Sequence, residues 1–308
     1  MELIRGLHNL RPRHHGSVVT LGNFDGVHLG HQAILRRLQE AGARLQLPDT
    51  VMIFEPQPQE FFQGDAAPAR LMHWRDKVEA LAAAGVSRVL CVRFSAAFRA
   101  LTARQFIDEL LVRGLGCRHL VIGDDFRFGC DRSGDFALLQ AAGAEQGFTV
   151  QGTPTIEIAG ERVSSTRIRA ALKAADFVTA EELLGRPYRV SGHVVHGDKL
   201  GRTLGVPTAN VLAQRQVSPL SGIYAVTVHD ALPQPVHGVC SVGKRPTVNG
   251  LDERFETYLL DFAGDLYGHR IHLEFHHKIR DELKFDSLDE LKVAMQKDIA
   301  DTRHYFGI

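Results

Sequence analysis

Two histidines lie three residues apart where an apolar, strand-like run gives way to a helical one. His28 and His31 belong to the segment Gly22–Gln32, which also contains Asn23 and three glycines. A helix N-terminus presents unpaired backbone N–H groups and the positive end of the helix dipole, so this junction suits a phosphate. Both imidazoles can point to one side of the first turn. They could donate hydrogen bonds to a phosphate that gains charge in a transition state, where loss of one such donor costs about 10²–10³ in rate.

The histidine pair could also arise in two ways that involve no phosphate. With 16 histidines in the chain, two can fall at this spacing on the surface without a role. A pair at this spacing could also bind a metal ion. Asn23 and the glycines favour the phosphate site, since glycine lets the backbone approach a ligand closely.

A second polar group opens a later helix, in the segment Ser164–Arg169. Hydroxyls at a helix start are usually caps, which is sufficient to account for Ser165 or Thr166 alone. Capping does not account for Arg167 and Arg169, because cations at a helix N-terminus oppose the dipole. An anion held between them would offset that repulsion, so the segment indicates a second anion contact.

A third group follows a glycine-rich stretch near residue 200. Thr208 and Asn210 are two residues apart, so in an extended segment their side chains share a face. Both carry neutral oxygen ligands, which suit Mg²⁺ held jointly with substrate phosphates. Gly201 and its neighbouring glycines could instead mark tight turns only.

A carboxylate further along the chain could act as a base. Phosphoryl transfer to an alcohol calls for such a group beside the hydroxyl, and Glu256 lies in a run that otherwise reads as a strand. Charged residues in strands are more often exposed carboxylates at the rim of a barrel. Both interpretations of Glu256 stay open at this point.

The elements that must position these groups follow two patterns, of which the first extends to about residue 185. Short apolar runs alternate there with helical ones, which predicts an α/β domain with a doubly wound parallel sheet. The expected strands are Ser17–Leu21, Thr50–Phe54, Arg88–Val92, His119–Ile122 and Phe148–Val150. The expected helices are Ala33–Leu45, Trp74–Ala84, Thr102–Val112, Phe136–Ala144 and Ile168–Ala175. Thr102 and Gln105 have the spacing of a capping box.

From residue 186 onward, short runs are separated by Gly, Pro, Asn and Asp, which predicts a small antiparallel barrel. The expected strands include Arg189–Val194, Gly222–Val228, Phe255–Phe262 and Arg270–Phe275. A last helix begins at Ser287, with Glu290 completing a capping box. Its apolar stripe should pack on the barrel and consists of Leu288, Leu291, Met295 and Ile299. We place the two domains at residues 1–185 and 186–308.

The composition bounds the class of protein. Of the 308 residues, 44% are hydrophobic and 23% charged, and Lys plus Arg equals Asp plus Glu at 36 each. These are ordinary globular values, and the balance predicts no attraction to nucleic acid. The four cysteines form no C-x-x-C pair, which argues against disulfides and structural zinc. Without a signal peptide or an apolar run of membrane length, we expect a cytoplasmic protein that does not bind membranes.

Taken together, these segments resemble one family. Three of them are similar to the adenylyltransferase half of the bacterial bifunctional riboflavin kinase/FMN adenylyltransferase (FAD synthetase) family: Gly22–Gln32, Gly123–Gly129 and Ser164–Arg169. The first includes His28-Leu29-Gly30-His31, a His-x-Gly-His core shared by a wider nucleotidyltransferase superfamily. Four others are similar to the riboflavin kinase half: Pro207–Asn210, Gly222–Val226, the strand around Glu256, and Ile279–Phe285.

For the first half, the resemblance implies direct attack of the FMN phosphate on the α-phosphorus of ATP, with pyrophosphate as the leaving group. His28 and His31 would stabilise the charge at that phosphorus. The nucleotide would be bound by Gly22, Asn23, Asp125, Ser165, Thr166 and Arg169. Of these, Ser165, Thr166 and Arg169 would hold the triphosphate, while Asn23 and Asp125 would line the nucleotide and metal side. Asp125 can also be interpreted as a turn residue.

For the second half, the resemblance implies a six-stranded barrel in which Glu256 is the general base on the ribityl hydroxyl of riboflavin. Thr208 and Asn210 would hold Mg²⁺ with ATP, and Gly201 would contact the nucleotide. Val206 departs from the family pattern, in which phenylalanine is expected before Pro-Thr-Ala-Asn. The implied function is phosphorylation of riboflavin to FMN and adenylylation of FMN to FAD, both with ATP.

From the first domain only, a related enzyme that adenylylates another small phosphate ester is an alternative, and the barrel with its Glu256 strand counts against it. Two further alternatives compete with this interpretation. One is a single-activity FMN adenylyltransferase whose barrel binds flavin without phosphorylating it, and the presence of Thr208, Asn210 and Glu256 counts against it. The other is a flavin-binding regulator with two degenerate sites, and the intact pair of His28 and His31 counts against that. The sequence leaves the oligomeric state open.

Overall fold

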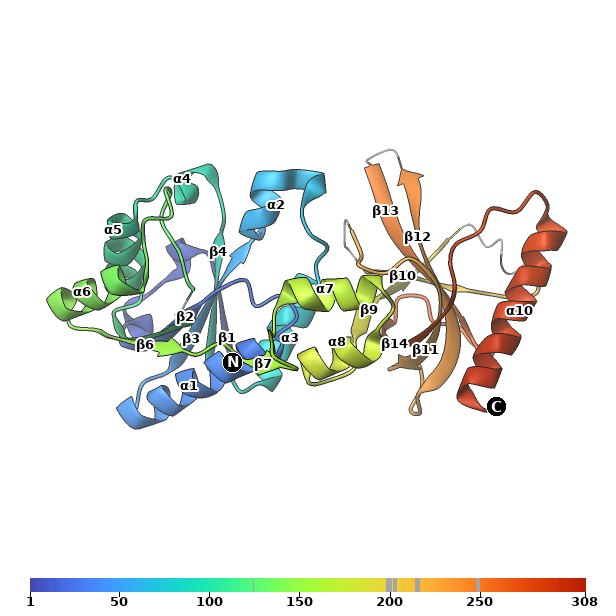
Figure 1. Cartoon of the computed structure of the whole chain (residues 1–308), viewed down its shortest axis with the longest axis horizontal. Helices are drawn as coiled ribbons and strands as arrows, with labels where there is room; N and C mark the ends of the chain where they lie inside the picture. Colours follow the sequence, from blue (N-terminus) through green and yellow to red (C-terminus); the bar gives the residue numbers. More distant parts are fainter. Residues whose placement is uncertain (124, 198–200, 202–203, 214–216, 248–249) are drawn as a thin grey trace. The chain divides into compact units, whose positions relative to one another are not determined.

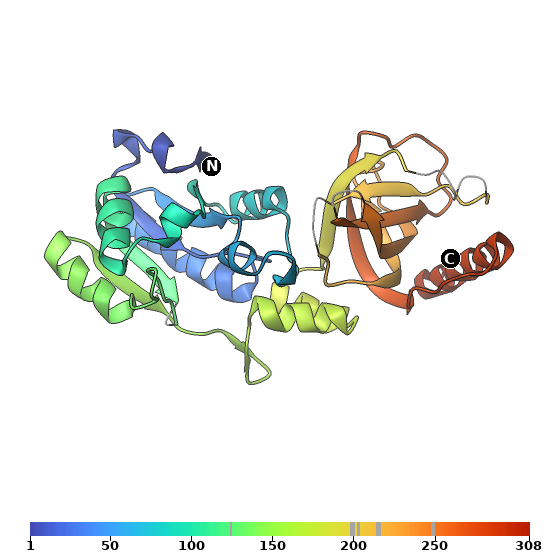
Figure 2. The same ribbon diagram turned by 90° about the horizontal axis from the view of Figure 1, so that it is seen from above.

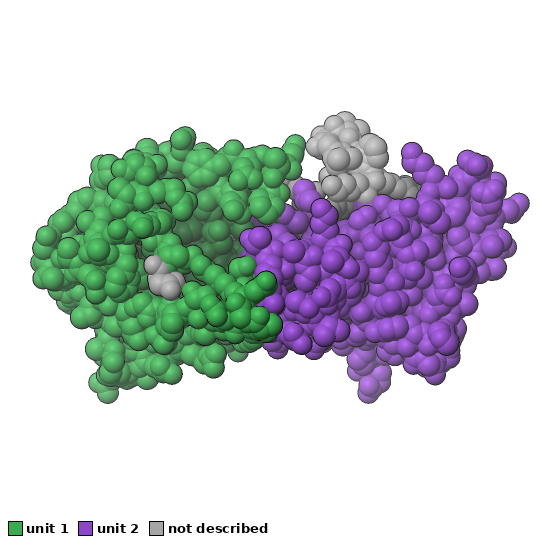
Figure 3. All heavy atoms as spheres, in the orientation of Figure 1, with its two compact units in different colours: residues 1–68, 74–164 green, residues 69–73, 165–308 purple. Residues whose placement is uncertain are grey.

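The structure is a computed structural model that describes all residues except 124, 198–200, 202–203, 214–216 and 248–249. For the residues described within 244–253, it describes the backbone only. By their contacts, the described residues form two compact units (Figure 3). Unit 1 contains Met1–Pro68 and Trp74–Ser164, and unit 2 contains Ala69–His73 and Ser165–Ile308.

Unit 1 is built on a six-stranded parallel sheet in the order β1-β4-β3-β2-β5-β6 (Figure 1). Its strands are β1 (Glu2–Arg5), β2 (Ser17–Leu21), β3 (Asp49–Glu55), β4 (Arg88–Arg93), β5 (Cys117–Gly123) and β6 (Thr149–Thr153). All of β2 and most of β3 are buried, as expected of strands covered on both faces. The doubly wound sheet is therefore confirmed. The sequence missed β1, because a four-residue edge strand carries little pattern.

The connections of unit 1 are mostly helical. Its helices are α1 (Leu29–Leu45), α2 (Pro58–Gln63), α3 (Trp74–Ala83), α4 (Ala96–Arg99), α5 (Ala103–Phe106), η4 (Ile107–Gly114) and α6 (Phe136–Gln146). Short 3₁₀ turns are η1 (Leu7–Asn9), η2 (Pro12–His14) and η3 (Gly64–Ala66), and a hairpin of β7 (Glu157–Ile158) and β8 (Glu161–Arg162) follows β6. The expected capping box is present, since the N–H of Gln105 donates to Oγ1 of Thr102 at 3.2 Å and that of Thr102 to Oε1 of Gln105 at 2.9 Å. The helix that it starts is divided, because the turns widen in η4.

Unit 2 contains a closed barrel in the order β10-β13-β12-β11-β14-β9, with antiparallel neighbours throughout. Its strands are β9 (Arg189–Val195), β10 (Ala209–Leu212), β11 (Gly222–His229), β12 (Val236–Thr247), β13 (Gly250–Leu259) and β14 (Arg270–Arg280). The six-stranded antiparallel barrel is confirmed. β12 was not among the strands named from the sequence, because Gly and Pro interrupt it. β10 was expected only as an extended segment around Asn210, because it has four residues.

Two helices precede the barrel, α7 (Ser165–Lys173) and α8 (Phe177–Leu184). Phe177 packs on the aromatic core of the barrel, with ring centroids 5.8 Å from Tyr224 and 6.3 Å from Phe275. By contacts, these helices therefore group with the barrel, and the compact units divide at Ser164/Ser165. The division into domains 1–185 and 186–308 stays a sequence-based prediction.

The last helix, α10 (Leu288–Phe306), lies beside the barrel in both views (Figure 2). Ser287 caps it by accepting from the N–H of Glu290 at 3.2 Å, while the Glu290 carboxylate accepts from the N–H of Asp286 at 3.2 Å. Within the expected stripe, Leu288 is 56% exposed, whereas Leu291, Met295 and Ile299 are partly buried. No helix among the described residues has both the length and the apolar character needed to cross a membrane.

Candidate active sites

The histidine pair lies at the point where the sheet of unit 1 reverses its order. β2 is flanked by β3 on one side and β5 on the other, so the chain leaves the carboxyl edge of the sheet in opposite directions there. Doubly wound sheets bind ligands in the crevice that such a reversal creates. The loops at this edge are 22–28 after β2 and the start of Gly123–Gly129 after β5. Two segments that carry the family resemblance therefore meet at this edge.

His28 ends the first of these loops and caps α1. Its Nδ1 accepts a hydrogen bond from the N–H of His31 at 3.3 Å, and the two rings stack with centroids 3.6 Å apart. Gly30 permits this arrangement, because a Cβ there would lie 3.1 Å from Cε1 of His28. Val27 has φ of 43°, a conformation that β-branched residues rarely adopt. Backbone strain of this kind clusters at functional sites.

His31 is neutral near pH 7. Burial lowers the pKa of His31 well below its usual 6.5, and the charges of His28, Lys77 and Arg162 lower it further. Its Nδ1 is buried and has no hydrogen-bond partner among the described residues. A buried polar atom left unpaired costs about 1–3 kcal/mol. An unsatisfied nitrogen among cationic groups fits a site that an anionic ligand completes.

Asp125, which was expected on the nucleotide and metal side, is paired with an arginine of β8. Nη1 of Arg162 lies 2.6 Å from Oδ2 of Asp125, and this hydrogen bond lowers the pKa of Asp125. The charge of Arg162 also contributes to the lowered pKa of His31. Gly22 and Asn23 are half-buried in the loop after β2. The sequence did not indicate Arg162, since its partners are distant in the chain.

The groups expected to hold the triphosphate begin α7 in unit 2. Ser165 is the half-buried first residue of this helix, and Thr166 is exposed. Nε of Arg169 donates to the carbonyl of Ala69 at 2.5 Å. Arg169 therefore anchors the segment Ala69–His73, a contact that the sequence did not indicate.

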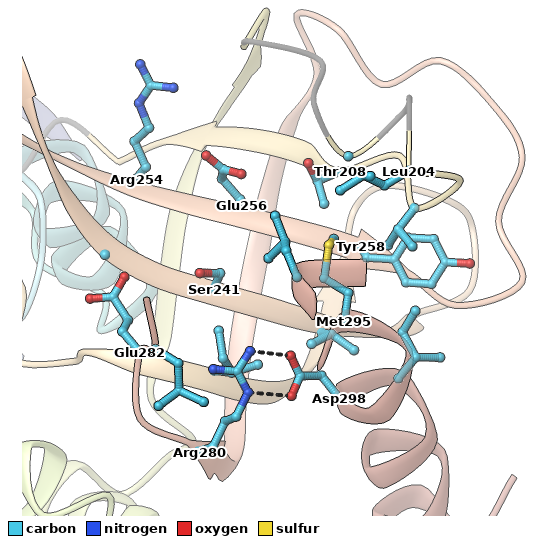
Figure 4. Close-up of a pocket in the computed structure, with 18 of the residues that line it drawn as sticks. Leu204, Thr208, Ser241, Arg254, Glu256, Tyr258, Arg280, Glu282, Met295 and Asp298 are labelled. Atoms are coloured by element: carbon cyan, nitrogen blue, oxygen red, sulfur yellow. Dashed lines mark hydrogen bonds and ion pairs between the residues drawn. The ribbon is translucent and has the colours of Figure 1, made fainter. Parts of the chain in front are cut away.

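The residues expected for phosphoryl transfer line one cavity of the barrel, with a volume of about 340 Å³ (Figure 4). The strand register brings them there, since Asn210 of β10 pairs with Glu256 of β13, and Glu256 with Ser241 of β12. Thr208 and Gly201 line the same cavity from the chain before β10. Glu256, which the residue spacing could not relate to Thr208 and Asn210, thus lines the same cavity as they do.

Two glycines allow the chain before β10 to pack closely. A Cβ on Gly197 would lie 2.4 Å from Nδ2 of Asn210, and one on Gly201 would lie 2.4 Å from the carbonyl oxygen of Val206. The residues between and after them, 198–200 and 202–203, lie outside the described chain. At both positions glycine is required for a close approach and does more than form a turn.

The cavity also has an apolar region and charged groups that the sequence analysis did not assign to a cavity, although it noted the segment Ile279–Phe285 and the stripe with Leu291, Met295 and Ile299. Its apolar lining includes Tyr258, Leu283, Phe285, Leu291, Met295 and Ile299. Its further charged residues are Arg254, Arg280, Glu282 and Asp298. A signal for Asp298 was present, because this acidic residue interrupts the apolar stripe of α10.

Unit 1 carries an exposed aromatic cluster that the sequence analysis also missed. Phe61 and Phe62 of α2 are 37% and 57% exposed, and their rings lie 5.3 and 5.8 Å from that of Phe94. The guanidinium of Arg99 lies 5.2 Å from the ring centre of Phe62. Because α2 follows β3 and Phe94 follows β4, the cluster belongs to the carboxyl edge of the sheet. The adjacent pair Phe61-Phe62 was the available signal.

Comparisons with known proteins match both halves of the chain. Residues 10–167 match the FAD synthetase family, and residues 184–306 match the riboflavin kinase family. The bifunctional riboflavin kinase/FMN adenylyltransferase of Pseudomonas fluorescens is 55% identical over 98% of this chain and 97% of its own. The protein of the same name from Escherichia coli is 53% identical over 100% of this chain and 99% of its own.

A solved structure shares the fold over nearly the whole chain. It is the crystal structure of a Streptococcus pneumoniae protein named a macrolide-efflux protein, which is 32% identical with a TM-score of 0.82. The match covers 98% of this chain and 99% of that one. With both halves matched in order and full-length relatives above 50% identity, the chain belongs to the family of bifunctional riboflavin kinase/FMN adenylyltransferases.

Proposed function

We propose that the two activities of this family, phosphorylation of riboflavin and adenylylation of FMN, are carried by separate groups of residues in this chain. The kinase activity belongs to the barrel cavity of unit 2, and the adenylyltransferase activity depends on the histidine pair of unit 1. The observation that carries this division is the strand register that sets Asn210 against Glu256 beside Ser241. It forms a polar site in the barrel that is independent of His28 and His31.

In the kinase reaction, Glu256 takes the proton from the ribityl hydroxyl while that oxygen bonds to the γ-phosphorus of ATP, the bond to the β–γ bridging oxygen breaks, and ADP leaves. A positioned base of this kind contributes about 10²–10⁴ in rate. The apolar region of the cavity around Leu291 and Met295 would hold the flavin ring, which places the ribityl chain toward Glu256. Riboflavin and ATP thus enter one cavity from its apolar and polar ends.

The donor set of the cavity fits a magnesium ion. Thr208 and Asn210 offer neutral oxygen atoms, and the register places the Glu256 carboxylate next to Asn210. Mg²⁺ prefers oxygen ligands and is usually held jointly with substrate phosphates. When bound, it would offset the phosphate charge. Thr208 and Asn210 would hold it, and Gly201 would let the phosphates approach the backbone.

In the adenylyltransferase reaction, a phosphate oxygen of FMN attacks the α-phosphorus of ATP, and pyrophosphate leaves. His28 and His31 donate hydrogen bonds to the α-phosphate oxygens as their charge rises. The neutral state of His31 keeps one ring nitrogen protonated and able to donate. Gly22, Asn23 and Asp125 would line the nucleotide, with Arg162 orienting Asp125. The assignment of the departing phosphates to Ser165, Thr166 and Arg169, which lie in α7 of unit 2, stays a prediction of the sequence.

The aromatic cluster of unit 1 offers a place for the flavin of FMN. A planar ring can stack on Phe61 or Phe62, which are exposed beside Arg99. The cluster lies at the same edge of the sheet as the loops that carry the histidine pair.

Incubation of the purified protein with riboflavin and Mg-ATP, followed by separation of the flavins, tests the proposal. FMN and FAD should both accumulate, and supplied FMN should give FAD without riboflavin. FAD formation from FMN without any phosphorylation of riboflavin would favour a single-activity adenylyltransferase. Formation of neither product would overturn the proposal in favour of a flavin-binding protein. The cytoplasmic location remains a prediction of the sequence.

A further inference from the structure

Asp298 is a buried carboxylate on the apolar face of α10. It is 4% exposed and lines the barrel cavity together with Leu291, Met295 and Ile299 of the same helix. A carboxylate in such surroundings is strongly unfavourable unless it is paired and hydrogen-bonded. The apolar packing of α10 therefore does not explain why a carboxylate occupies position 298.

Arg280, the last residue of β14, provides the pairing. Its Nε and Nη2 donate to the two carboxylate oxygens of Asp298, each at 2.7 Å, and Figure 4 shows the two groups facing each other beside Met295. Its Nη1 donates to the carbonyl of Asp281 at 2.9 Å, and its guanidinium lies 5.7 Å from the ring centre of Phe285. One guanidinium therefore joins β14, the segment that follows it, and α10.

Stability alone does not account for this pair. Well-packed apolar residues in place of a buried ion pair are often neutral or stabilising. An apolar residue at position 298 would also extend the stripe of Leu291, Met295 and Ile299. A bidentate pair fixes the relative orientation of its two side chains, because both oxygens and both N–H groups must align. The pair thus sets the position of α10 against the barrel more narrowly than apolar packing does.

A second ion pair on α10 allows a comparison. Arg303 lies 2.5 Å from Asp261, and their side chains are 35% and 71% exposed. Neither residue lines the cavity, whereas Arg280 and Asp298 both do. Exposed pairs contribute little to stability. Comparison of the two pairs therefore distinguishes an ion pair that only attaches α10 to the barrel from one that also shapes the cavity.

We propose that the Arg280–Asp298 pair is a positioning device for riboflavin in the kinase reaction. It holds Phe285 and the face of α10 that carries Leu291, Met295 and Ile299 at the spacing that accepts the flavin ring. This inference rests on the proposed assignment of the kinase activity to the barrel cavity. Arg280 and Asp298 act through this apolar wall. They therefore affect the binding of riboflavin and have little effect on the rate of phosphoryl transfer.

Steady-state kinetics of the full chain test the proposal with two conservative variants, Asp298→Asn and Arg280→Lys. Each should raise the KM for riboflavin at least about tenfold while kcat changes less than about threefold, the pattern expected when binding energy alone is lost. Quenching of riboflavin fluorescence should show the same loss of affinity without turnover. The matched control is Asp261→Asn, the same chemical change in the exposed pair, which should alter KM less than about twofold.

Several outcomes would overturn the inference. They are an unchanged KM in both variants, an equal rise in the Asp261→Asn control, or a fall in kcat at constant KM. A cooperative unfolding transition followed by near-UV circular dichroism reports folding of the barrel in each variant, because the FMN-to-FAD reaction depends on unit 1 and does not test the barrel. If Asp298→Asn does not fold, the double variant Arg280→Gln with Asp298→Asn decides, because it leaves no unpaired charge and should still show the raised KM. A wild-type protein without kinase activity would refute the proposed function itself.

Discussion

The histidine site of unit 1 and the barrel cavity of unit 2 differ in how far apart their residues lie in the chain. His28, His31 and the loop that carries them fall within Gly22–Gln32, between one strand and the helix it leads into. The cavity draws on residues from Gly201 to Ile299, supplied by several strands and α10. A local site tolerates change elsewhere in its domain, whereas a dispersed site depends on register and helix docking. The predictions below test that difference.

The largest expected effect concerns the base of the dispersed site. Glu256→Gln removes the proton acceptor but keeps the shape, so kinase turnover should fall about 10²–10⁴-fold. Conversion of supplied FMN to FAD should be unchanged. Chromatographic separation of the flavins after timed incubation measures both rates, and parallel loss of the two activities would contradict two separate sites.

The next effect concerns one donor of the local site. His28→Ala removes a hydrogen-bond donor and the cap of α1, so FAD formation should fall about 10²–10³-fold. Riboflavin phosphorylation should continue, and FMN should accumulate. His28→Asn serves as the control for capping, because asparagine is a good N-cap. Full adenylylation by the alanine variant would exclude the assigned role.

Substitution of one glycine at each site allows a direct comparison of the two sites. Gly197→Ala places a Cβ 2.4 Å from Nδ2 of Asn210 and should displace that amide, lowering kinase activity about 10–100-fold. Gly30→Ala meets Cε1 of His28 only at 3.1 Å, so adenylylation should fall less than about tenfold. Rates for both reactions in both variants form the test. An effect of either glycine on the other reaction would show that the sites are coupled.

The smallest effect is the pH dependence of stability. Burial lowers the pKa of His31 well below 6.5, so below that pH the unfolded chain binds a proton at this residue that the folded chain does not. Stability should therefore decline as pH falls below about 6.5, with a slope of at most about 1.4 kcal/mol per pH unit. His31→Gln should flatten the decline in chemical unfolding curves. An identical slope in wild type and variant would contradict this origin.

The sequence predicted most of the sheet because each strand of a doubly wound domain is an uninterrupted apolar run. β2 matches its expectation at both ends, Ser17 and Leu21. The sequence was less informative in the barrel, where β10 has four residues and β12 contains Gly238, Gly243 and Pro246. Antiparallel strands of that kind are specified by their cross-strand partners, which single-chain patterns do not reveal.

The same distinction holds for the site residues. His28 and His31 could be paired from the sequence because a helical turn brings residues three apart to one side. Glu256 could not be joined to Asn210 in that way, since their contact depends on the β10–β13 register. Arg162 was missed for the same reason, because β8 brings it to Asp125.

By itself, the sequence determined the family, the two fold types and the local chemistry of the histidine loop. These depend on periodicity and on spacings within one turn or one loop, which the backbone geometry imposes directly. The tertiary structure alone decided that Thr208, Asn210 and Glu256 share a cavity. It also decided that Arg280 forms an ion pair with Asp298 in the lining of that cavity. Contacts between distant residues follow from strand register and helix docking, which are set by the packing of the whole barrel.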